Sequence, residues 1–319
     1  MKSRILSLCL ILVIASLLFA FTPTSTSAYP EGTVTFIVPA GAGGGLDTMC
    51  RKLASVLPKY LPGKGNIVIK NVTPPAIIKG TAVLNKSKPD GYTIAMTYVE
   101  SCVWAQFTQN LSFDVRKLTH LGALHSNKYF LVAKPDYPYN SLKEIAASKT
   151  KVVWAELPTA YQLWALIASD LSGIENYSII TSLKGAKGMA LALLRGDADL
   201  AIIATTSVKP YLESGDLKAL MSTTTTPVAE GVPTAKELGY EVLSKASNPQ
   251  ILVGPPNMDK EIAKLLSEAA KKAVTTDKEF IDWGKNAGYD MEWMSPKEIG
   301  EAIDATSDLF EKYIPLLKK

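Results

Sequence analysis

The sequence predicts an α/β protein built from about two domains. Its 319 residues are the length of two average domains. After Pro30, short runs rich in β-branched residues alternate with segments of helical periodicity, which is typical of a largely parallel sheet flanked by helices. From Lys260 onward the chain is mostly amphipathic helix. Such a tail suits two lobes joined by two crossovers, with the tail packed back on the first lobe.

The first part of the chain alternates strand and helix patterns. Val34 opens an apolar, β-rich run that ends before a glycine-rich segment, and the turn of residues 88–91 leads into another such run. The strands expected here cover residues 34–38, 67–70, 92–97 and 129–133, and the helices cover residues 47–60, 79–85 and 101–109.

A second series of patterns follows residue 150. The strands expected here cover residues 152–155, 178–181, 200–204, 218–221 and 251–254, and the helices cover residues 159–171 and 186–195. We expect the crossovers between the lobes near residues 127–130 and 247–250.

Residues 1–28 have the pattern of a secretory signal peptide. Lys2 and Arg4 form a positive start, residues 5–21 are apolar, and small residues precede a cleavage position after Ala28. The alternative is a retained membrane anchor, for which the apolar run is near the lower length limit. We therefore expect a periplasmic or otherwise extracytoplasmic protein. Without Lys2 and Arg4 the formal net charge falls from +4 to +2, which gives no indication of a nucleic-acid partner.

Little in the sequence supports an enzyme. His120 and His125 are its two histidines; they lie outside any H-E-x-x-H or G-x-S-x-G motif, and no Cys/His pair has zinc spacing. We expect no metal and no cofactor, and we expect both histidines to be satisfied by local hydrogen bonds. Cys50 and Cys102 could form a disulfide in an oxidising compartment or remain buried thiols, and the sequence leaves both open.

The segment Gly41-Ala42-Gly43-Gly44-Gly45 follows an expected strand and opens an expected helix. Free backbone N–H groups and a helix N-terminus attract an anion in this setting, and glycines let a ligand oxygen approach the amides. A dinucleotide fingerprint is the first alternative, but Leu46 replaces its third glycine. The second alternative is a simple turn in which Asp47 only caps the helix.

Several motifs, in this order, cover nearly the whole mature chain. They are Tyr29-Pro30, Ile37-Val38-Pro39, Gly43-Gly44-Gly45-Leu46-Asp47, Asn71, Gly80-Thr81, Lys88-Pro89-Asp90-Gly91-Tyr92-Thr93, Lys184-Gly185, Gly196, Asp199, Gly215-Asp216-Leu217-Lys218, Val232-Pro233-Thr234, Glu237-Leu238-Gly239-Tyr240 and Val253-Gly254-Pro255-Pro256. In this series the chain resembles the periplasmic solute-binding receptors of tripartite tricarboxylate transporters, known as the Bug family.

The resemblance implies a two-lobe periplasmic-binding-protein fold of the type II kind, with a mixed sheet flanked by helices in each lobe. Lobe 1 would comprise residues 29–128 and 250–319, lobe 2 residues 129–249, and the C-terminal helices would pack back on lobe 1. It also implies a monomer that captures a small organic acid in the interlobe cleft and delivers it to the subunits of a membrane transporter. A receptor that feeds a sensor kinase, or a secreted enzyme with Asp47 or Glu156 as a general base, remains an alternative.

The resemblance also places the ligand site on loops of both lobes. In lobe 1, residues 40–45 with Asp47, the loop 73–79 and the segment 98–101 would face the cleft. In lobe 2, residues 156–160 and 204–206 would complete it, with Thr159 as the main hydroxyl. The expected ligand-binding residues are Ala40, Gly41, Ala42, Gly43, Gly44, Gly45, Asp47, Pro75, Ala76, Tyr98, Glu156, Pro158, Thr159, Ala160 and Thr205.

This chain departs from the family pattern at several expected contacts. Residues 72–79 and 155–159 are bulkier and more apolar than the glycine- and serine-rich turns usual there, Gln162 replaces a histidine, and Ile203 replaces an acidic residue. We therefore expect a ligand with one carboxylate at the glycine-rich segment and a remainder less polar than citrate. The alternative is a family-typical acid bound through other contacts.

Overall fold

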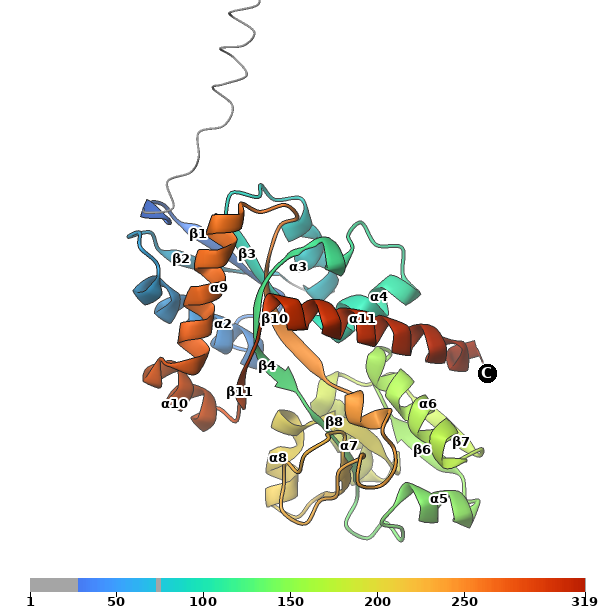
Figure 1. Cartoon of the computed structure of the whole chain (residues 1–319). Coiled ribbons are helices and arrows are strands. Elements are labelled where there is room, and N and C mark those ends of the chain that lie inside the picture. The colour runs from blue at the N-terminus through green and yellow to red at the C-terminus, as the bar shows by residue number, and fades with distance from the viewer. Residues whose placement is uncertain (1–27, 73–75, 319) are drawn as a thin grey trace, which may run out of the picture.

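The computed structural model describes residues 28–72 and 76–318, so the predicted signal peptide lies almost entirely outside the described residues. Two lobes are visible, each with its own sheet and helices (Figure 1). The expected two-lobe α/β architecture is thus present. In the described part of the chain, no helix combines the length and apolarity that a membrane crossing requires.

Lobe 1 contains a six-stranded sheet in the order β11-β4-β10-β3-β1-β2. β1 runs parallel to β2 and β3, because helical crossovers join these three strands. β10 returns between β3 and β4 and is antiparallel to both. The strands are β1 (Val34–Val38), β2 (Ile67–Asn71), β3 (Thr93–Tyr98), β4 (Thr119–Asn127), β10 (Asn248–Gly254) and β11 (Met291–Met294); the crossover helices are α2 (Gly45–Val56), α3 (Ala76–Asn85) and α4 (Val99–Thr108).

Lobe 2 contains the strands β8-β5-β9, which pair antiparallel, and the parallel pair β6-β7. A bridge between Trp154 and Leu200 connects the two groups. The strands are β5 (Tyr129–Ala133), β6 (Val152–Ala155), β7 (Tyr177–Ile180), β8 (Ala201–Ala204) and β9 (Lys218–Ser222); the helices are α5 (Leu142–Ser148), α6 (Ala160–Ser172), α7 (Gly185–Arg195) and α8 (Thr205–Glu213).

The sheets are mixed, as the resemblance implies, rather than largely parallel, as strand–helix alternation alone suggests. The reason is that β4 passes into β5 through Lys128 alone, and β10 re-enters the first sheet from lobe 2. Four elements escape the sequence patterns: β4, α5, α8 and β11. α8 is obscured by Pro210 within it, and β11 by the helical pattern on both sides of it.

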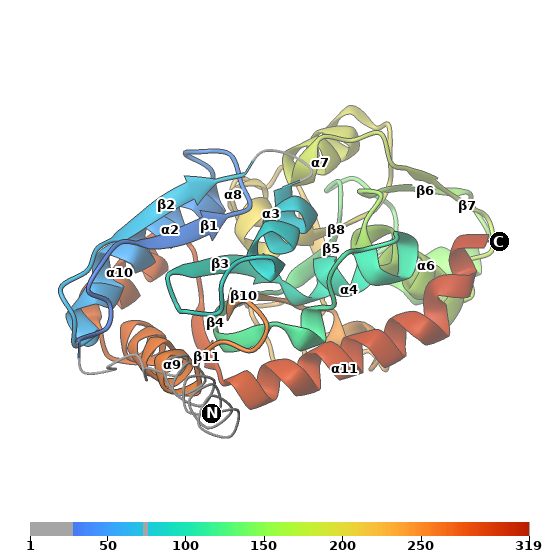
Figure 2. The same cartoon turned by 90° about the horizontal axis from the view of Figure 1, so that it is seen from above.

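The C-terminal segment covers lobe 1 and also reaches lobe 2. α9 (Lys260–Thr275) and α10 (Lys278–Asn286) pack on lobe 1, and α11 (Pro296–Tyr313) runs along α4 and continues as the 3-10 helix η5 (Ile314–Lys318), which packs on α6. Figure 2 shows α11 passing from one lobe to the other. Phe310 contacts Trp104 of lobe 1 and Trp164 of lobe 2 edge-on, each at 6.2 Å between ring centroids. One hydrophobic cluster therefore spans both lobes on this side.

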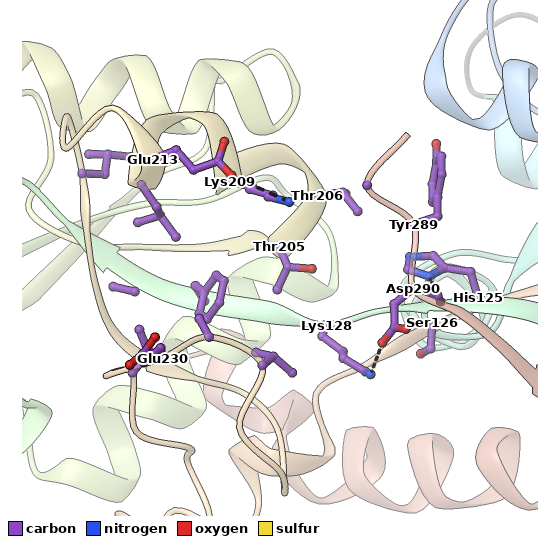
Figure 3. A pocket seen from close by; sticks show the side chains of 18 of the residues that line it. His125, Ser126, Lys128, Thr205, Thr206, Lys209, Glu213, Glu230, Tyr289 and Asp290 are labelled. Carbon is purple, nitrogen blue, oxygen red and sulfur yellow. Dashed lines mark hydrogen bonds and ion pairs between the residues drawn. The ribbon is translucent and has the colours of Figure 1, made fainter. Parts of the chain in front are cut away.

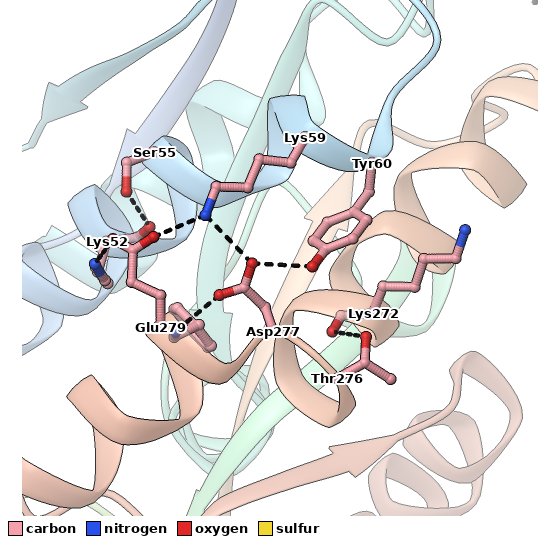
Figure 4. A network of polar contacts seen from close by, with 9 residues as sticks. Lys52, Ser55, Lys59, Tyr60, Lys272, Thr276, Asp277 and Glu279 are labelled. Atoms are coloured by element: carbon pink, nitrogen blue, oxygen red, sulfur yellow. Dashed lines mark hydrogen bonds and ion pairs between the residues drawn. The ribbon is translucent and has the colours of Figure 1, made fainter.

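A polar network fixes α10 to the end of α2 and the 3-10 helix η2 (Leu57–Tyr60) (Figure 4). Asp277 caps α10 by accepting from the N–H of Phe280 at 2.9 Å, and its second oxygen accepts from the Tyr60 hydroxyl at 2.9 Å. Lys59 bonds to Asp277 and Glu279. The remaining 3-10 helices are η3 (Val115–Lys117) and η4 (Leu243–Lys245).

Candidate functional site

The glycine-rich segment of residues 41–45 forms an exposed loop between β1 and α2. Gly43 has φ +81°, a left-handed conformation that residues with a side chain rarely adopt. A Cβ atom on Gly45 would lie 2.8 Å from the hydroxyl of Tyr289, so the close approach of this tyrosine requires glycine there. α2 begins at Gly45, and the N–H groups of its first turn have no intrahelical acceptor.

Asp47 holds this loop in shape. Its Oδ2 accepts from the N–H of Gly43 and from Nε of Arg51, both at 2.8 Å, and its Oδ1 accepts from Nδ2 of Asn71 at 2.7 Å. The bond from Arg51 is the main cause that lowers the pKa of Asp47 to about 2. Gly44 is the N-cap, so Asp47 supports the helix start from within the first turn rather than as the cap. Both carboxylate oxygens are already bonded to protein groups.

A cavity of about 250 Å³ lies between the lobes. Three of the expected site residues line it, namely Tyr98, Thr159 and Ala160. Thr159 is the N-cap of α6, and its hydroxyl accepts from the N–H of Tyr161 at 3.4 Å. The complete lining is Ile77, Tyr98, Glu100, Ser101, Asn127, Leu157, Thr159, Ala160, Tyr161 and Asn248.

Three helices begin at the wall of this smaller cavity. Ile77 lies in the first turn of α3, Glu100 and Ser101 in the first turn of α4, and Ala160 opens α6. The unbonded N–H groups and the dipole of a helix N-terminus favour an anion. Among the described residues that line the cavity, none is basic. The N–H of Glu100 already bonds to Asn248 and that of Tyr161 to Thr159, so an anion here would be held by other backbone amides and by hydroxyls rather than by an ion pair.

Glu100 connects the two lobes at this cavity. It lies in lobe 1 and is 1% exposed, and its oxygens accept from two groups of lobe 2, the Tyr129 hydroxyl at 2.6 Å and the Trp164 indole N–H. Burial raises the pKa of Glu100 to about 7, and the two donors partly oppose this rise. Its own N–H donates to Oδ1 of Asn248 at 3.1 Å.

A larger cavity of about 690 Å³ opens between α8 and the loop before β11 (Figure 3). His125, Ser126, Lys128 and Phe130, from β4, β5 and the residue between them, line it, whereas Asn127 lines the smaller cavity. Its lysines include Lys128, the residue between β4 and β5, which pairs with Asp290 of the loop before β11 at 3.0 Å. Thr205, the first residue of α8 and an expected site residue, lies here together with Thr206, Lys209, Tyr289 and an apolar floor.

The other expected site residues lie outside these cavities or outside the described residues. Glu156 is fully buried at the end of β6, where Oε1 accepts from the N–H of Ile202 at 2.8 Å and burial raises its pKa. Pro158 is exposed beside the smaller cavity. Pro75 is not described, and Ala76 is the first residue of α3. The segment 40–45 lines neither cavity, although Tyr289 connects it to the larger one.

The cysteines and histidines are structural in the described chain. Cys50 and Cys102 are buried free thiols on different helices. His120 bonds locally to the carbonyl of Val115 at 2.9 Å. For His125 the expectation of purely local bonds is wrong, because Nδ1 contacts the carbonyl of Asp290, 165 residues away, at 2.8 Å. The described residues contain no cluster of three His, Cys, Asp or Glu side chains suited to a metal.

Asn127 and Asn248 are the cavity residues that sequence reasoning missed. They face each other in the register of β4 and β10, at the positions where the chain leaves and re-enters lobe 1. The predicted crossovers near 127–130 and 247–250 are the signal that could have found them. Polar residues at both crossovers lie beside the space between the lobes, because the chain passes from one lobe to the other there.

Comparison with known proteins identifies the family to which this chain belongs. Residues 49–315 match the model of the tripartite tricarboxylate transporter family receptor. A UPF0065 protein of Bordetella pertussis is 25% identical over 288 residues, covering 86% of each chain.

Solved structures share the fold. A TctC solute-binding protein from Polaromonas superposes with a TM-score of 0.77 at 22% identity, covering 90% of this chain and 99% of that one. A protein of R. palustris solved with adipate superposes with a TM-score of 0.71 at 20% identity, covering 90% and 98%. This chain therefore belongs to the receptor family of tripartite tricarboxylate transporters, whose members are solute-binding proteins and not enzymes.

Proposed function

We propose that this receptor binds a small organic acid between its lobes, with a carboxylate group in the smaller cavity. The observation that carries the proposal is the convergence of three helix N-termini, from α3 and α4 of lobe 1 and α6 of lobe 2, on that one cavity. Hydroxyls of Tyr98, Ser101 and Thr159 lie in the same lining. Amides and hydroxyls of this kind solvate a carboxylate once water is removed.

Both lobes contribute to the cavity, so bound ligand stabilises the closed arrangement. We infer that the lobes move about the crossovers near Lys128 and before β10, as in hinge closure around a ligand. The closed form would then be recognised by the membrane subunits of a transporter outside the cytoplasm. The adipate bound by the R. palustris relative supports an organic acid as the ligand class.

The test is thermal unfolding of the mature chain, from Tyr29, against a panel of mono-, di- and tricarboxylic acids. A ligand at 100 times its Kd should stabilise the folded state by about 2.7 kcal/mol, and the Tm should rise accordingly. A folded protein whose Tm no acid changes would contradict the proposal.

Three tryptophan variants locate the site. Ile77→Trp fills the smaller cavity from α3 and should abolish the shift. Val83→Trp is the matched control, because Val83 lies on the same helix and is 41% exposed. Ala229→Trp partly fills the larger cavity and should leave binding intact. If Ala229→Trp alone lost binding, the acid would have to bind in the larger cavity instead.

A further inference from the structure

The wall of the smaller cavity contains one acidic residue among the described residues that line it. Glu100 belongs to its lining, although only 1% of the residue is exposed to solvent. Its side chain points toward lobe 2, where the hydroxyl of Tyr129 and the indole of Trp164 donate to its two oxygens. An indole N–H can only donate, so the Glu100 oxygen facing it must accept. These donors favour the ionised form, but burial outweighs them and raises the pKa of Glu100 to about 7, so the side chain is mainly ionised only above that pH.

In the described part of the chain, no basic side chain bonds to Glu100 or lines the cavity beside it. Its hydrogen-bond partners among the described residues are the neutral side chains of Tyr129 and Trp164, and its neighbours in the cavity lining are neutral as well. The polar lining consists of hydroxyls and amides from Tyr98, Ser101, Asn127, Thr159, Tyr161 and Asn248. In its ionised form Glu100 repels a negative group of a ligand the more strongly the closer that group lies, because little water screens the interaction.

A dicarboxylate would therefore meet two opposite environments. Its first carboxylate is favoured by the N-termini of α3, α4 and α6, whereas its second would lie beside Glu100 and be repelled. A ligand without the second carboxylate avoids the repulsion by Glu100 and keeps the interaction of its first carboxylate with the helix N-termini. Building a repulsive group against the wrong ligand is a general route to specificity.

We infer that Glu100 is the specificity-determining residue of the cleft and restricts the receptor to acids that carry a single carboxylate. This inference rests on the proposed function and adds the substrate class to it. It sets this chain apart from the R. palustris relative, which was solved with the dicarboxylate adipate.

The test uses matched ligand pairs on the native mature protein at pH 8, where Glu100 is ionised. Each pair is a dicarboxylate and its monomethyl ester, from malonate to adipate, and Kd is measured by titration calorimetry. The monoester of the pair that binds should bind about tenfold more tightly than its diacid, the ratio that 1.4 kcal/mol produces. In Glu100→Gln, which removes the charge and keeps the shape, the two affinities should become equal within about twofold.

Glu268→Gln is the matched control, since Glu268 lies exposed on α9 and its loss changes the net charge equally. It should keep the native preference. Tighter binding of the diacids by the native protein would overturn the assignment of Glu100 while leaving the proposed function intact, and so would an unchanged preference in Glu100→Gln. Binding of no acid at all would overturn both. If Glu100→Gln fails to fold, the comparison of diacid and monoester on the native protein still tests the preference for a single carboxylate.

Discussion

Asp47 and Glu100 are both buried carboxylates in the first turn of a helix, yet their surroundings differ in kind. Asp47 has the cation of Arg51, a backbone N–H and an amide as partners, and its pKa falls to about 2. Glu100 has two neutral donors from the other lobe, and burial raises its pKa to about 7. The first carboxylate bonds with both oxygens to groups that fix a loop, whereas the second lies in the wall of a cavity without a cation as partner among the described residues. The opposite shifts follow from the partners: a cation and hydrogen-bond donors outweigh burial at Asp47, whereas burial outweighs the two neutral donors at Glu100.

The largest expected effect tests the packing that holds Glu100 in place. Phe310 is fully buried between Trp104 and Trp164. Phe310→Ala should lower the free energy of unfolding by about 3–5 kcal/mol, because it leaves a cavity where three aromatic rings meet. Urea denaturation measures this, with Phe310→Leu as the milder variant. A loss below 1 kcal/mol would mean that the tail does not couple the lobes.

Asp47→Ala should destabilise by about 2 kcal/mol, since it strands the N–H of Gly43 and the side chain of Asn71. Asp47→Asn keeps an acceptor and should lose roughly half as much. The same urea measurements check both variants. Equal losses would show that the charge of Asp47, rather than its hydrogen bonds, organises the glycine-rich loop.

Trp164→Phe removes the donor to Glu100 and keeps an aromatic ring against Phe310. A lost hydrogen bond to a charged group predicts a loss of about 1.5 kcal/mol. Trp104→Phe is the control on the other side of Phe310, where no bond to Glu100 is involved. Identical losses in urea for both variants would assign the effect to packing alone.

The last prediction concerns the pH dependence of stability, for which the two carboxylates predict opposite signs. The pKa of Glu100 is above its ordinary value of 4.5, so its contribution to stability is complete below pH 4.5 and is lost as the pH rises to about 7. The pKa of Asp47 is below 3.8, so its contribution is present above pH 3.8 and is lost as the pH falls through about 2. Each slope is at most about 1.4 kcal/mol per pH unit. Glu100→Gln should flatten the Tm profile between pH 4.5 and 7 only; an unchanged profile there would place the raised pKa on another group.

The sequence predicts the elements that follow simple periodicity. The helix expected from residue 47 and the strand expected at 34–38 are found as α2 with η2 and as β1, because each carries an unbroken apolar pattern. β4 was missed: its nine residues include two histidines and a glycine, and its polar positions face neighbours that only the fold brings close. Local pattern cannot reveal partners that are distant in sequence.

The candidate site was predicted in part for the same reason. Thr159 and Tyr98 were named because the resemblance places them on loops that face the cleft. In the structure they are the N-caps of α6 and α4, and both line the smaller cavity. The burial of Glu100 and its bonds to the other lobe could not be predicted from sequence, because its partners Tyr129 and Trp164 lie 29 and 64 residues away. The glycine-rich loop, the strongest local signal, lines neither cavity, and its side chain at Asp47 serves the loop itself.

The path of α11 and η5 has a practical consequence for handling this receptor. Ile314, Leu316 and Leu317 pack on the cluster shared by both lobes, so the end of the chain is a third tether beside the two crossovers. A C-terminal affinity tag or fused reporter would be attached next to the cluster that spans both lobes. Shortening the chain after Tyr313 would free the lobes on that side without touching any residue of either cavity. For biosensor design, the C-terminus is therefore a point from which opening of the cleft can be both sensed and disturbed.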